Sequence, residues 1–250
     1  MASEPPVLYH LAISHYSEKV RWAFSYKGVR HIRRATTGGM HVGLSLWLTR
    51  GESYTLPVLR LNDRVISDST RIVEALEHAF PDRALYPADP DERERALALE
   101  DHFDEELGPY IRRFAFAELS RDPDALGEVI AKLMPPPMNS PAIAGVVGKP
   151  FVRLRYGAGP SEGAEEARER TLAAFDRLEA ELNGNEFLVG DSFTVADLTA
   201  AALFYPAVLP PEGPDMPQPT ESLMAFRAEQ EDRPGYRWVQ KMYSEHRGSP

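Results

Sequence analysis

Three short segments, far apart in the sequence, carry residues that suit the binding of a small polar molecule. Ser14 lies where an apolar strand gives way to a helix, so that a hydroxyl group and free helix N–H groups come together there. Leu56-Pro57 opens a second apolar strand, and Asp68-Ser69 opens a second helix. Each segment offers backbone or hydroxyl hydrogen bonds toward one point, so we interpret the three together as a site for a small, polar, anionic ligand.

The elements that must position these residues alternate between short strands and amphipathic helices. Apolar residues at helical spacing predict a helix over 17–27, with Ser17 as its N-cap. Residues 37–52 are rich in glycine and mixed in polarity, and we predict a loop there with at most one helical turn. The other expected elements are strands at 7–11, 31–34, 56–61 and 64–67, and a helix from about residue 69 to 80. This order predicts a thioredoxin-like α/β domain over residues 1–82.

From residue 90 onward the pattern contains helices and no convincing strand. Apolar residues at helical spacing predict one long helix from Ala96 to Phe114 and another from Ala164 to Leu182. Between them, residues 120–163 are rich in proline and glycine, and we predict short helices and loops there, forming a lid or a flexible insert. The expected fold class is therefore a thioredoxin-like N-terminal domain followed by an all-helical C-terminal domain over residues 90–250.

Thr194 and Asp197 precede and begin an almost wholly apolar run, which predicts a buried helix. The spacing is that of a capping box, with aspartate in place of the usual glutamate. A buried helix start needs internal partners for its free N–H groups, and these two side chains can supply them. We predict that Asp197 is structural rather than catalytic.

Composition argues against several classes of protein. The net charge of −10 disfavours binding to a nucleic-acid backbone, and no cysteine is present to form disulfides, thiolate metal sites or cysteine nucleophiles. No apolar run approaches the roughly 20 residues that span a bilayer, and no basic, apolar leader is visible at the N-terminus. The seven histidines are scattered, so no metal site is expected. We expect a cytoplasmic protein without a membrane or nucleic-acid partner.

Four segments resemble the cytosolic glutathione S-transferase family, in that family's order and spacing. Residues 14–21, Ser-His-Tyr-Ser-Glu-Lys-Val-Arg, are similar to the start of its first helix, and Leu56-Pro57 to its apolar residue and cis-proline. Asp68-Ser69 is similar to its acidic residue–serine pair. Residues 187–198 are similar to its signature Phe-Leu-x-Gly, followed by Ser or Thr and then Ala-Asp.

The resemblance implies that glutathione, or another low-molecular-weight thiol, serves as co-substrate. Ser14 would donate its hydroxyl hydrogen to the sulfur and favour the thiolate, which then attacks an electrophilic carbon. Leu56 would pair its backbone with the bound peptide, beside a cis peptide bond that precedes Pro57. Asp68 and Ser69 would hold the charged γ-glutamyl end, Ser69 through its hydroxyl and the helix N-terminus.

Two points of the family pattern are less fully matched. His15 stands where the family commonly has proline, and Tyr9 is a second candidate for activating the thiol because other members use a tyrosine late in the first strand.

The pocket for the second substrate is expected between the domains, with Tyr110, Phe114 and Phe116 as candidates. The 120–163 segment is longer than the helical hairpin that the family usually has there, so the residues of this pocket cannot be assigned from the resemblance.

The resemblance therefore implies a homodimeric transferase that conjugates a glutathione-type thiol to an apolar electrophile in detoxification. The same fold also serves thiol-dependent isomerases, dehalogenases and ether-cleaving enzymes, which are alternatives within the enzyme class. From another class, a binding or interaction protein that kept the fold and lost turnover is a further alternative.

Overall fold

The computed structural model describes residues 4–134, 162–216 and 218–248, with a few isolated positions between 139 and 150. Its N-terminal part is built on a four-stranded sheet of order β2-β1-β3-β4, in which β1 and β2 are parallel and the other neighbours antiparallel. The thioredoxin-like α/β prediction is confirmed. The strands are β1 (Val7–His10), β2 (Ile32–Ala35), β3 (Val58–Leu61) and β4 (Arg64–Ser67).

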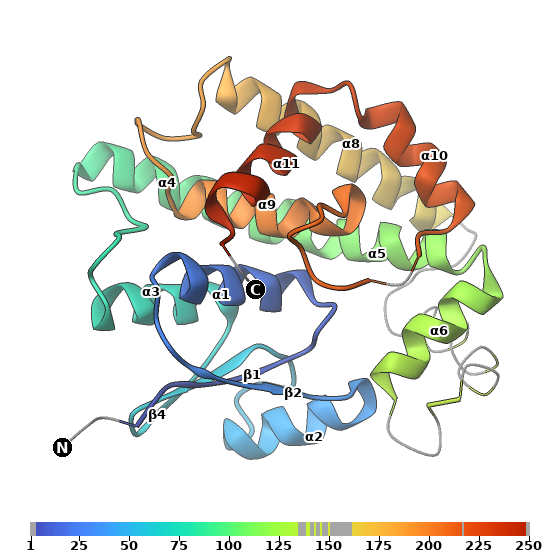
Figure 1. The fold of residues 1–250 in the computed structure, drawn as a ribbon, viewed down its shortest axis with the longest axis horizontal. Helices are drawn as coiled ribbons and strands as arrows, with labels where there is room; N and C mark the ends of the chain where they lie inside the picture. The colour runs from blue at the N-terminus through green and yellow to red at the C-terminus, as the bar shows by residue number, and fades with distance from the viewer. Residues whose placement is uncertain are drawn as a thin grey trace.

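Helices lie on both faces of this sheet (Figure 1). Helices α1 (His15–Tyr26) and α3 (Ser69–Ala79) lie between the sheet and the C-terminal helices, and α2 (Gly38–Leu48) lies on the opposite side. Because α1 packs against α3 and α9 and lies over the sheet (Figure 1), it is buried around most of its circumference. Because α1 is buried, its charged residues need partners of opposite charge inside the protein.

The described residues after β4 form only helices, as the sequence predicts. Helix α9 runs through their centre with every residue buried, and no helix of the described residues is long and apolar enough to cross a membrane. The helices are α4 (Pro90–His102), the π-helix η1 (Phe103–Leu107), α5 (Gly108–Leu119), α6 (Pro123–Leu133), α8 (Glu162–Leu182), α9 (Val195–Val208), α10 (Glu221–Gln230) and α11 (Pro234–His246).

The predicted long helix from Ala96 to Phe114 is interrupted by the π-helix η1. The wider turn precedes Gly108-Pro109, and a proline ring cannot continue an unbroken α-helical ladder. Within 120–163, α6 is one short helix of the kind predicted, and most of the segment that was predicted to form short helices and loops, as a lid or insert, lies outside the described residues.

The first helix begins earlier than predicted, at His15, and its N-cap is Ser14 rather than Ser17. Ser14 is extended, with φ −78° and ψ 126°, and its Oγ accepts a hydrogen bond from the Ser17 N–H at 3.2 Å. Ser17 is fully buried in the first turn, where its Oγ accepts from the N–H of Leu11 at 3.3 Å. Two serines three residues apart can each cap a helix, and the contacts of His15 with α5 favour the earlier start.

Residues 38–48 form helix α2, so the prediction of a loop there is wrong. The helix is held by polar side chains that an analysis of apolar periodicity does not register. Buried Ser45 donates its hydroxyl hydrogen to the carbonyl oxygens of Ser53 and Thr55, at 2.9 and 2.8 Å. Buried Thr49 lies one turn further on, and its hydroxyl accepts from the N–H of Ser53 at 3.0 Å. Tertiary bonds to the 53–55 loop therefore outweigh the weak helix propensity of the glycines.

The predicted capping box at the start of α9 is present. The Asp197 carboxylate accepts from the backbone N–H groups of Thr194 and Leu188, each at 2.8 Å, and from the Thr194 hydroxyl at 2.8 Å. Burial raises the pKa of Asp197 to about 6, against these hydrogen bonds, which favour the charged form. Asp197 thus joins the central helix to the 187–194 loop.

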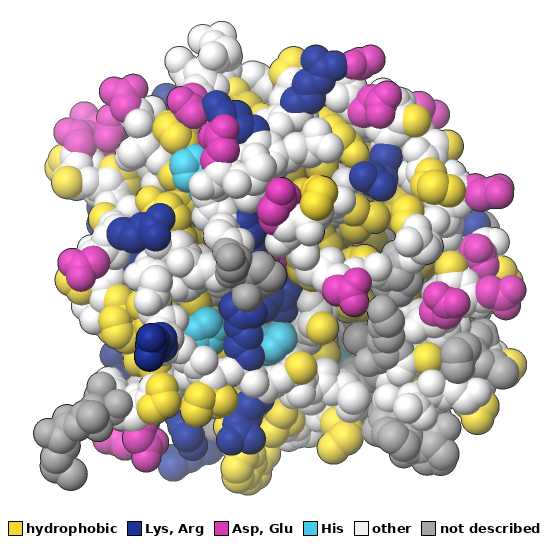
Figure 2. All heavy atoms as spheres, viewed as in Figure 1, with side chains coloured by type: hydrophobic (Ala, Val, Ile, Leu, Met, Phe, Trp, Pro, Cys, Tyr) yellow, Lys and Arg dark blue, Asp and Glu magenta, His cyan; other side chains and the backbone are white. Residues whose placement is uncertain are grey.

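Charge is unevenly distributed over the surface (Figure 2). On the face shown, acidic side chains lie mainly around the periphery, whereas Lys and Arg side chains gather near the centre beside histidine. A protein with a net charge of −10 therefore keeps a local basic area.

We expect Asp197→Ala to lower the free energy of unfolding by about 2–5 kcal/mol, because two buried N–H groups lose their acceptor. Urea denaturation followed by circular dichroism measures this change. Asp191→Ala, which removes an exposed carboxylate from the same loop, is the matched control and should leave the midpoint nearly unchanged. Equal effects of the two substitutions would contradict the structural role of Asp197.

Candidate functional site

A cavity of about 680 Å³ lies where the N-terminal sheet and helices meet α4, η1 and α5. It brings together the three segments that the sequence singled out: Ser14, Leu56-Pro57 and Asp68-Ser69 all line it. The other lining residues come from the turn before α1 and the start of that helix, from α2, the loop before β3 and α3, and from the C-terminal helices: Leu11, Ile13, His15, Tyr16, His41, Thr55, Thr70, Arg71, Asp101, Asp104, Glu105, Arg112 and Phe116.

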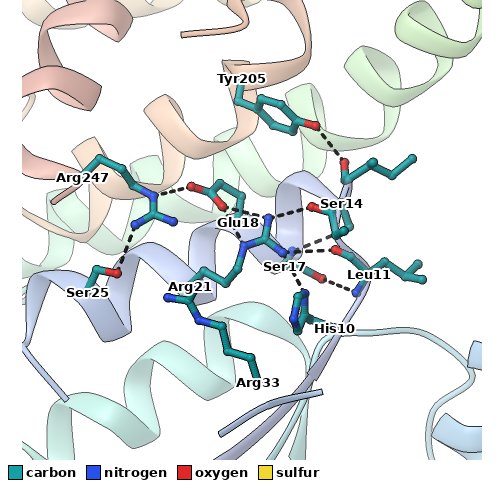
Figure 3. Close-up of polar contacts among 12 residues, drawn as sticks. His10, Leu11, Ser14, Ser17, Glu18, Arg21, Ser25, Arg33, Tyr205 and Arg247 are labelled. Atoms are coloured by element: carbon teal, nitrogen blue, oxygen red, sulfur yellow. Dashed lines mark hydrogen bonds and ion pairs between the residues drawn. The ribbon is translucent and has the colours of Figure 1, made fainter. Parts of the chain in front are cut away.

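Ser14 lies at the N-terminus of α1, on the turn that follows β1 (Figure 3). Its N–H donates to the carbonyl oxygen of Leu11 at 3.2 Å, and the Tyr205 hydroxyl of α9 donates to the carbonyl oxygen of Ile13 at 3.1 Å. The Ser14 hydroxyl oxygen accepts the cap bond from Ser17, which uses a lone pair and leaves the hydroxyl hydrogen available as a donor. Capping and donation to a ligand are therefore compatible in this geometry.

The residues after Ser14 fix the turn against the C-terminal helices. His15 is buried, and its Nε2 donates to the carbonyl oxygen of Gly108 at 2.9 Å. Burial, followed by the nearby Arg112 charge, lowers the pKa of His15 to about 3, so the ring is neutral at physiological pH. Tyr16 donates its hydroxyl hydrogen to the carbonyl oxygen of Asp104 at 3.0 Å. The ring fits because Gly108 has no Cβ, which would lie 2.1 Å from the Tyr16 hydroxyl oxygen.

The second and third segments close the cavity from the side of the sheet. The Leu56–Pro57 peptide bond is cis, as predicted, and Leu56 is buried just ahead of β3. Asp68 caps α3, its carboxylate accepting from the Arg71 N–H at 3.2 Å, with a φ of 80° that few residues other than glycine adopt. Ser69 follows at the first helical position, where the N–H has no intrahelical acceptor. A helix N-terminus of this kind attracts anionic groups.

A buried ionic network lies directly behind this wall of the cavity. The Lys19 ammonium of α1 lies 2.9 Å from a Glu100 carboxylate oxygen and 3.1 Å from Asp104 Oδ1, and it donates to Thr70 Oγ1 at 2.8 Å. Thr70 in turn donates to Asp104 Oδ2 at 2.9 Å. Burial alone would lower the pKa of Lys19, but Glu100 and Asp104 together raise it. The network ties α1 and α3 to α4 and η1, so it holds both halves of the cavity in place.

Several candidate residues lie elsewhere. Tyr9 is half-buried in β1 and does not line the cavity. Phe114 is buried in the helical core, where its ring centroid lies 4.6 Å from that of Phe226. The Tyr110 ring lies under the guanidinium groups of Arg113 and Arg170, outside the cavity lining.

The stripe of α5 that faces the cavity carries Arg112 and Phe116, whereas Tyr110 and Phe114 share a different stripe of that helix. Of the three aromatic candidates for the second-substrate pocket, Phe116 alone is among the described lining residues. The rest of this wall is polar, with Asp101, Asp104 and Glu105. These polar residues could not be predicted, because helical spacing alone does not say which stripe of a helix faces a cavity and which faces the core.

Two family models match the chain, and their matches agree with the fold. They are the glutathione S-transferase N-terminal domain, over residues 8–84, and the glutathione S-transferase C-terminal domain, over residues 133–234. The chain therefore belongs to the glutathione S-transferase family.

Solved structures share this fold along nearly their whole length. Glutathione transferase GSTFuA3 from Phanerochaete chrysosporium has 18% identity and a TM-score of 0.67, with 97% of each chain covered. The β-etherase LigF from Sphingobium sp. strain SYK-6 has 20% identity and a TM-score of 0.62, with 95% of this chain and 99% of the other covered. A bacterial maleyl pyruvate isomerase of the Zeta class has 23% identity and a TM-score of 0.59, with 96% and 92% covered. A comparison with curated proteins finds no match.

We expect Lys19→Met to lower the free energy of unfolding by about 3–5 kcal/mol at neutral pH, because it leaves buried carboxylates without their cation. Burial already raises the pKa of Glu100, and loss of Lys19 raises it further, so the folded variant binds a proton more tightly than the unfolded chain. Stability is then present at low pH and lost as the pH rises through the folded pKa of Glu100. The deficit should therefore shrink as the pH falls.

Urea titrations at several pH values measure this deficit. Lys241→Met is the control, since Lys241 and its partner Glu186 form an exposed ion pair. A deficit that is independent of pH, or no larger than that of the control, would contradict the account of the network.

Proposed function

We propose that this chain is a glutathione-dependent enzyme in which Ser14 activates the thiol and the cavity holds the tripeptide. The observation that carries the proposal is the convergence of Ser14, Leu56-Pro57 and Asp68-Ser69 on one cavity of about 680 Å³. These segments are far apart in the sequence, and the family to which the chain belongs supplies the ligand that such a set of groups would suit.

Ser14 would act by hydrogen bonding rather than by nucleophilic attack. A free thiol has a pKa of about 8.5 and is mostly protonated at neutral pH. A hydrogen bond to a charged group contributes about 1.5–3 kcal/mol, and one pKa unit corresponds to about 1.4 kcal/mol. Donation from the Ser14 hydroxyl, supported by the N-terminus of α1, would therefore lower the thiol pKa by about one to two units.

The remaining segments would bind the peptide part of glutathione. Leu56 lies before the paired residues of β3, so its backbone can pair with an extended peptide as an added strand would. The free N–H groups at the start of α3 and the Ser69 hydroxyl would receive the γ-glutamyl carboxylate. Asp68 would receive the ammonium group of the same residue.

The second substrate would be an electrophile with polar substituents rather than a wholly apolar one. Asp101, Glu105 and Arg112 line the cavity from the C-terminal helices, and Phe116 adds an apolar surface. Attack of the thiolate on a carbon held between Ser14 and this wall would give a thioether, and loss of a leaving group would complete the transfer.

The proposal predicts that Ser14→Ala raises the thiol pKa of bound glutathione by about one to two units, because the thiolate loses its donor. The ultraviolet absorbance of the thiolate, followed as a function of pH with saturating glutathione, measures this pKa. In a transferase assay, the loss of turnover should be about 10–100-fold at neutral pH and should largely disappear at alkaline pH, where the thiol ionises unaided.

Ser14→Thr is the matched control, since it keeps both the hydroxyl donor and the helix cap. It should leave the thiol pKa within a few tenths of a unit of the wild-type value, and thermal melts of both variants check that the fold is retained. A thiol pKa that is the same in Ser14→Ala as in the wild type would sink the proposed role of Ser14.

A further inference from the structure

A second cavity, of about 870 Å³, lies on the other side of the turn that carries Ser14. Ile13 lines both cavities, so the segment between β1 and α1 is the wall between them. Arg33 of β2, the loop that follows α9, and the arginines Arg227 and Arg247 complete the lining of the second cavity. The proposed glutathione site and the candidate catalytic serine are not part of it.

The buried side of this cavity is made of two arginines that share one carboxylate (Figure 3). Arg21 Nε donates to Glu18 Oε2 at 2.8 Å, and Arg247 Nε donates to Glu18 Oε1. Arg247 Nη1 also donates to the Ser25 hydroxyl at 3.1 Å. Arg21 and Arg247 are 5% and 1% exposed, so both charges are held in the protein interior.

The donors of these two arginines are used to different extents. Arg21 has further bonds to His10 Nδ1 at 2.9 Å and to the carbonyl oxygens of Leu11 and Ala12 at 3.2 and 3.0 Å. Its guanidinium is therefore committed to holding the 10–12 segment. Arg247, by contrast, has no hydrogen-bond partner for Nη2 among the described residues. Because the Arg247 side chain lines the cavity, this nitrogen is available to a ligand there.

Two more arginines face the cavity without a carboxylate partner in the described part of the chain. Arg33 Nε donates to His31 Nε2 at 3.1 Å, and Arg227 Nε donates to the Tyr236 hydroxyl at 3.2 Å. Among the described residues, the terminal nitrogens of both guanidiniums have no hydrogen-bond acceptor, so they can bind another group. Their planar pairs of N–H groups match the oxygens of a phosphate or carboxylate group.

The charges of the lining residues do not balance. Four guanidinium groups face two carboxylates, those of Glu18 and Asp215. Partial desolvation, together with the charges of Arg247 and Arg21, lowers the pKa of Arg33, as expected where like charges are crowded at the surface. Burial and Arg21 lower the pKa of His10 to about 4, so His10 adds no charge at neutral pH. The cavity therefore has an excess of two positive charges among its lining residues.

His10 adds a neutral donor to this set. Since the Arg21 guanidinium has no lone pair to offer, His10 Nδ1 accepts, and the ring proton lies on Nε2. The opposite wall is apolar, with Leu209, Pro210, Pro211 and Met216. The cavity thus combines a cationic floor with an apolar wall.

We propose that this second cavity binds a small organic dianion of the phosphomonoester class, with its phosphate on Arg33, Arg227 and Arg247 and its apolar body against the 209–216 loop. The dianion would neutralise the excess charge and would occupy the terminal guanidinium nitrogens. An inorganic phosphate ion would supply the same charge without using the apolar wall.

Calorimetric titration of the full chain with phenyl phosphate, at constant ionic strength, tests this proposal. We expect saturable binding that saturating glutathione does not displace, and binding of inorganic phosphate at least fivefold weaker. Arg33→Gln should weaken the binding of phenyl phosphate about tenfold, because it removes one charged hydrogen-bonding group. Circular dichroism checks that the variant is folded, which is expected for an exposed position on an edge strand.

Arg34→Gln is the matched control, because it makes the same change of charge at the next residue of β2, outside the cavity lining. It should weaken binding less than twofold. Absence of saturable binding, displacement by glutathione, or equal weakening by Arg33→Gln and Arg34→Gln would overturn the proposal. Equal affinity for inorganic phosphate and phenyl phosphate would overturn the assignment of the apolar wall.

Discussion

Helix α1 is buried on nearly all sides although it carries three charged side chains, Glu18, Lys19 and Arg21. The need to pair these buried charges determines how the surrounding elements are arranged. A buried charge is tolerated only when it is paired, so each must find its partner inside the protein. Lys19 forms ion pairs with carboxylates on α4 and η1, and Glu18 forms an ion pair with Arg247, which follows α11. The charged residues of α1 therefore form ion pairs that join the sheet-containing part to the helical part.

The same helix fixes the geometry of both cavities. Its N-terminus presents Ser14 to the first cavity, and the Lys19 network holds the opposing walls of that cavity at a set distance. Its Glu18 holds two of the four arginines that line the second cavity, Arg21 and Arg247. A change in the position of α1 would thus move the candidate catalytic hydroxyl of Ser14 and, at the same time, Arg21 and Arg247 of the second cavity.

Much of the fold and part of the site could be predicted from the sequence, because those features depend on local signals. The strand–helix order and the Thr194–Asp197 cap follow from residue type and spacing within a few positions. Helix α2 could not be predicted in this way, because Ser45 and Thr49 hold it through bonds to another loop. The C-terminal wall of the first cavity depends on which stripe of α5 faces it, and the second cavity depends on how β2 and the loop after α9 lie against α1. Both arrangements are set by tertiary packing.

The central claim is that the first cavity is a glutathione site, and calorimetric titration of the protein with glutathione tests it most directly. The account predicts saturable binding that Ser69→Ala weakens about tenfold, since it removes a hydrogen bond to a charged carboxylate. Ser67→Ala, at the end of β4 and outside the cavity lining, should bind as the wild type does. No saturable binding at millimolar glutathione, or equal weakening by the two substitutions, would contradict the account.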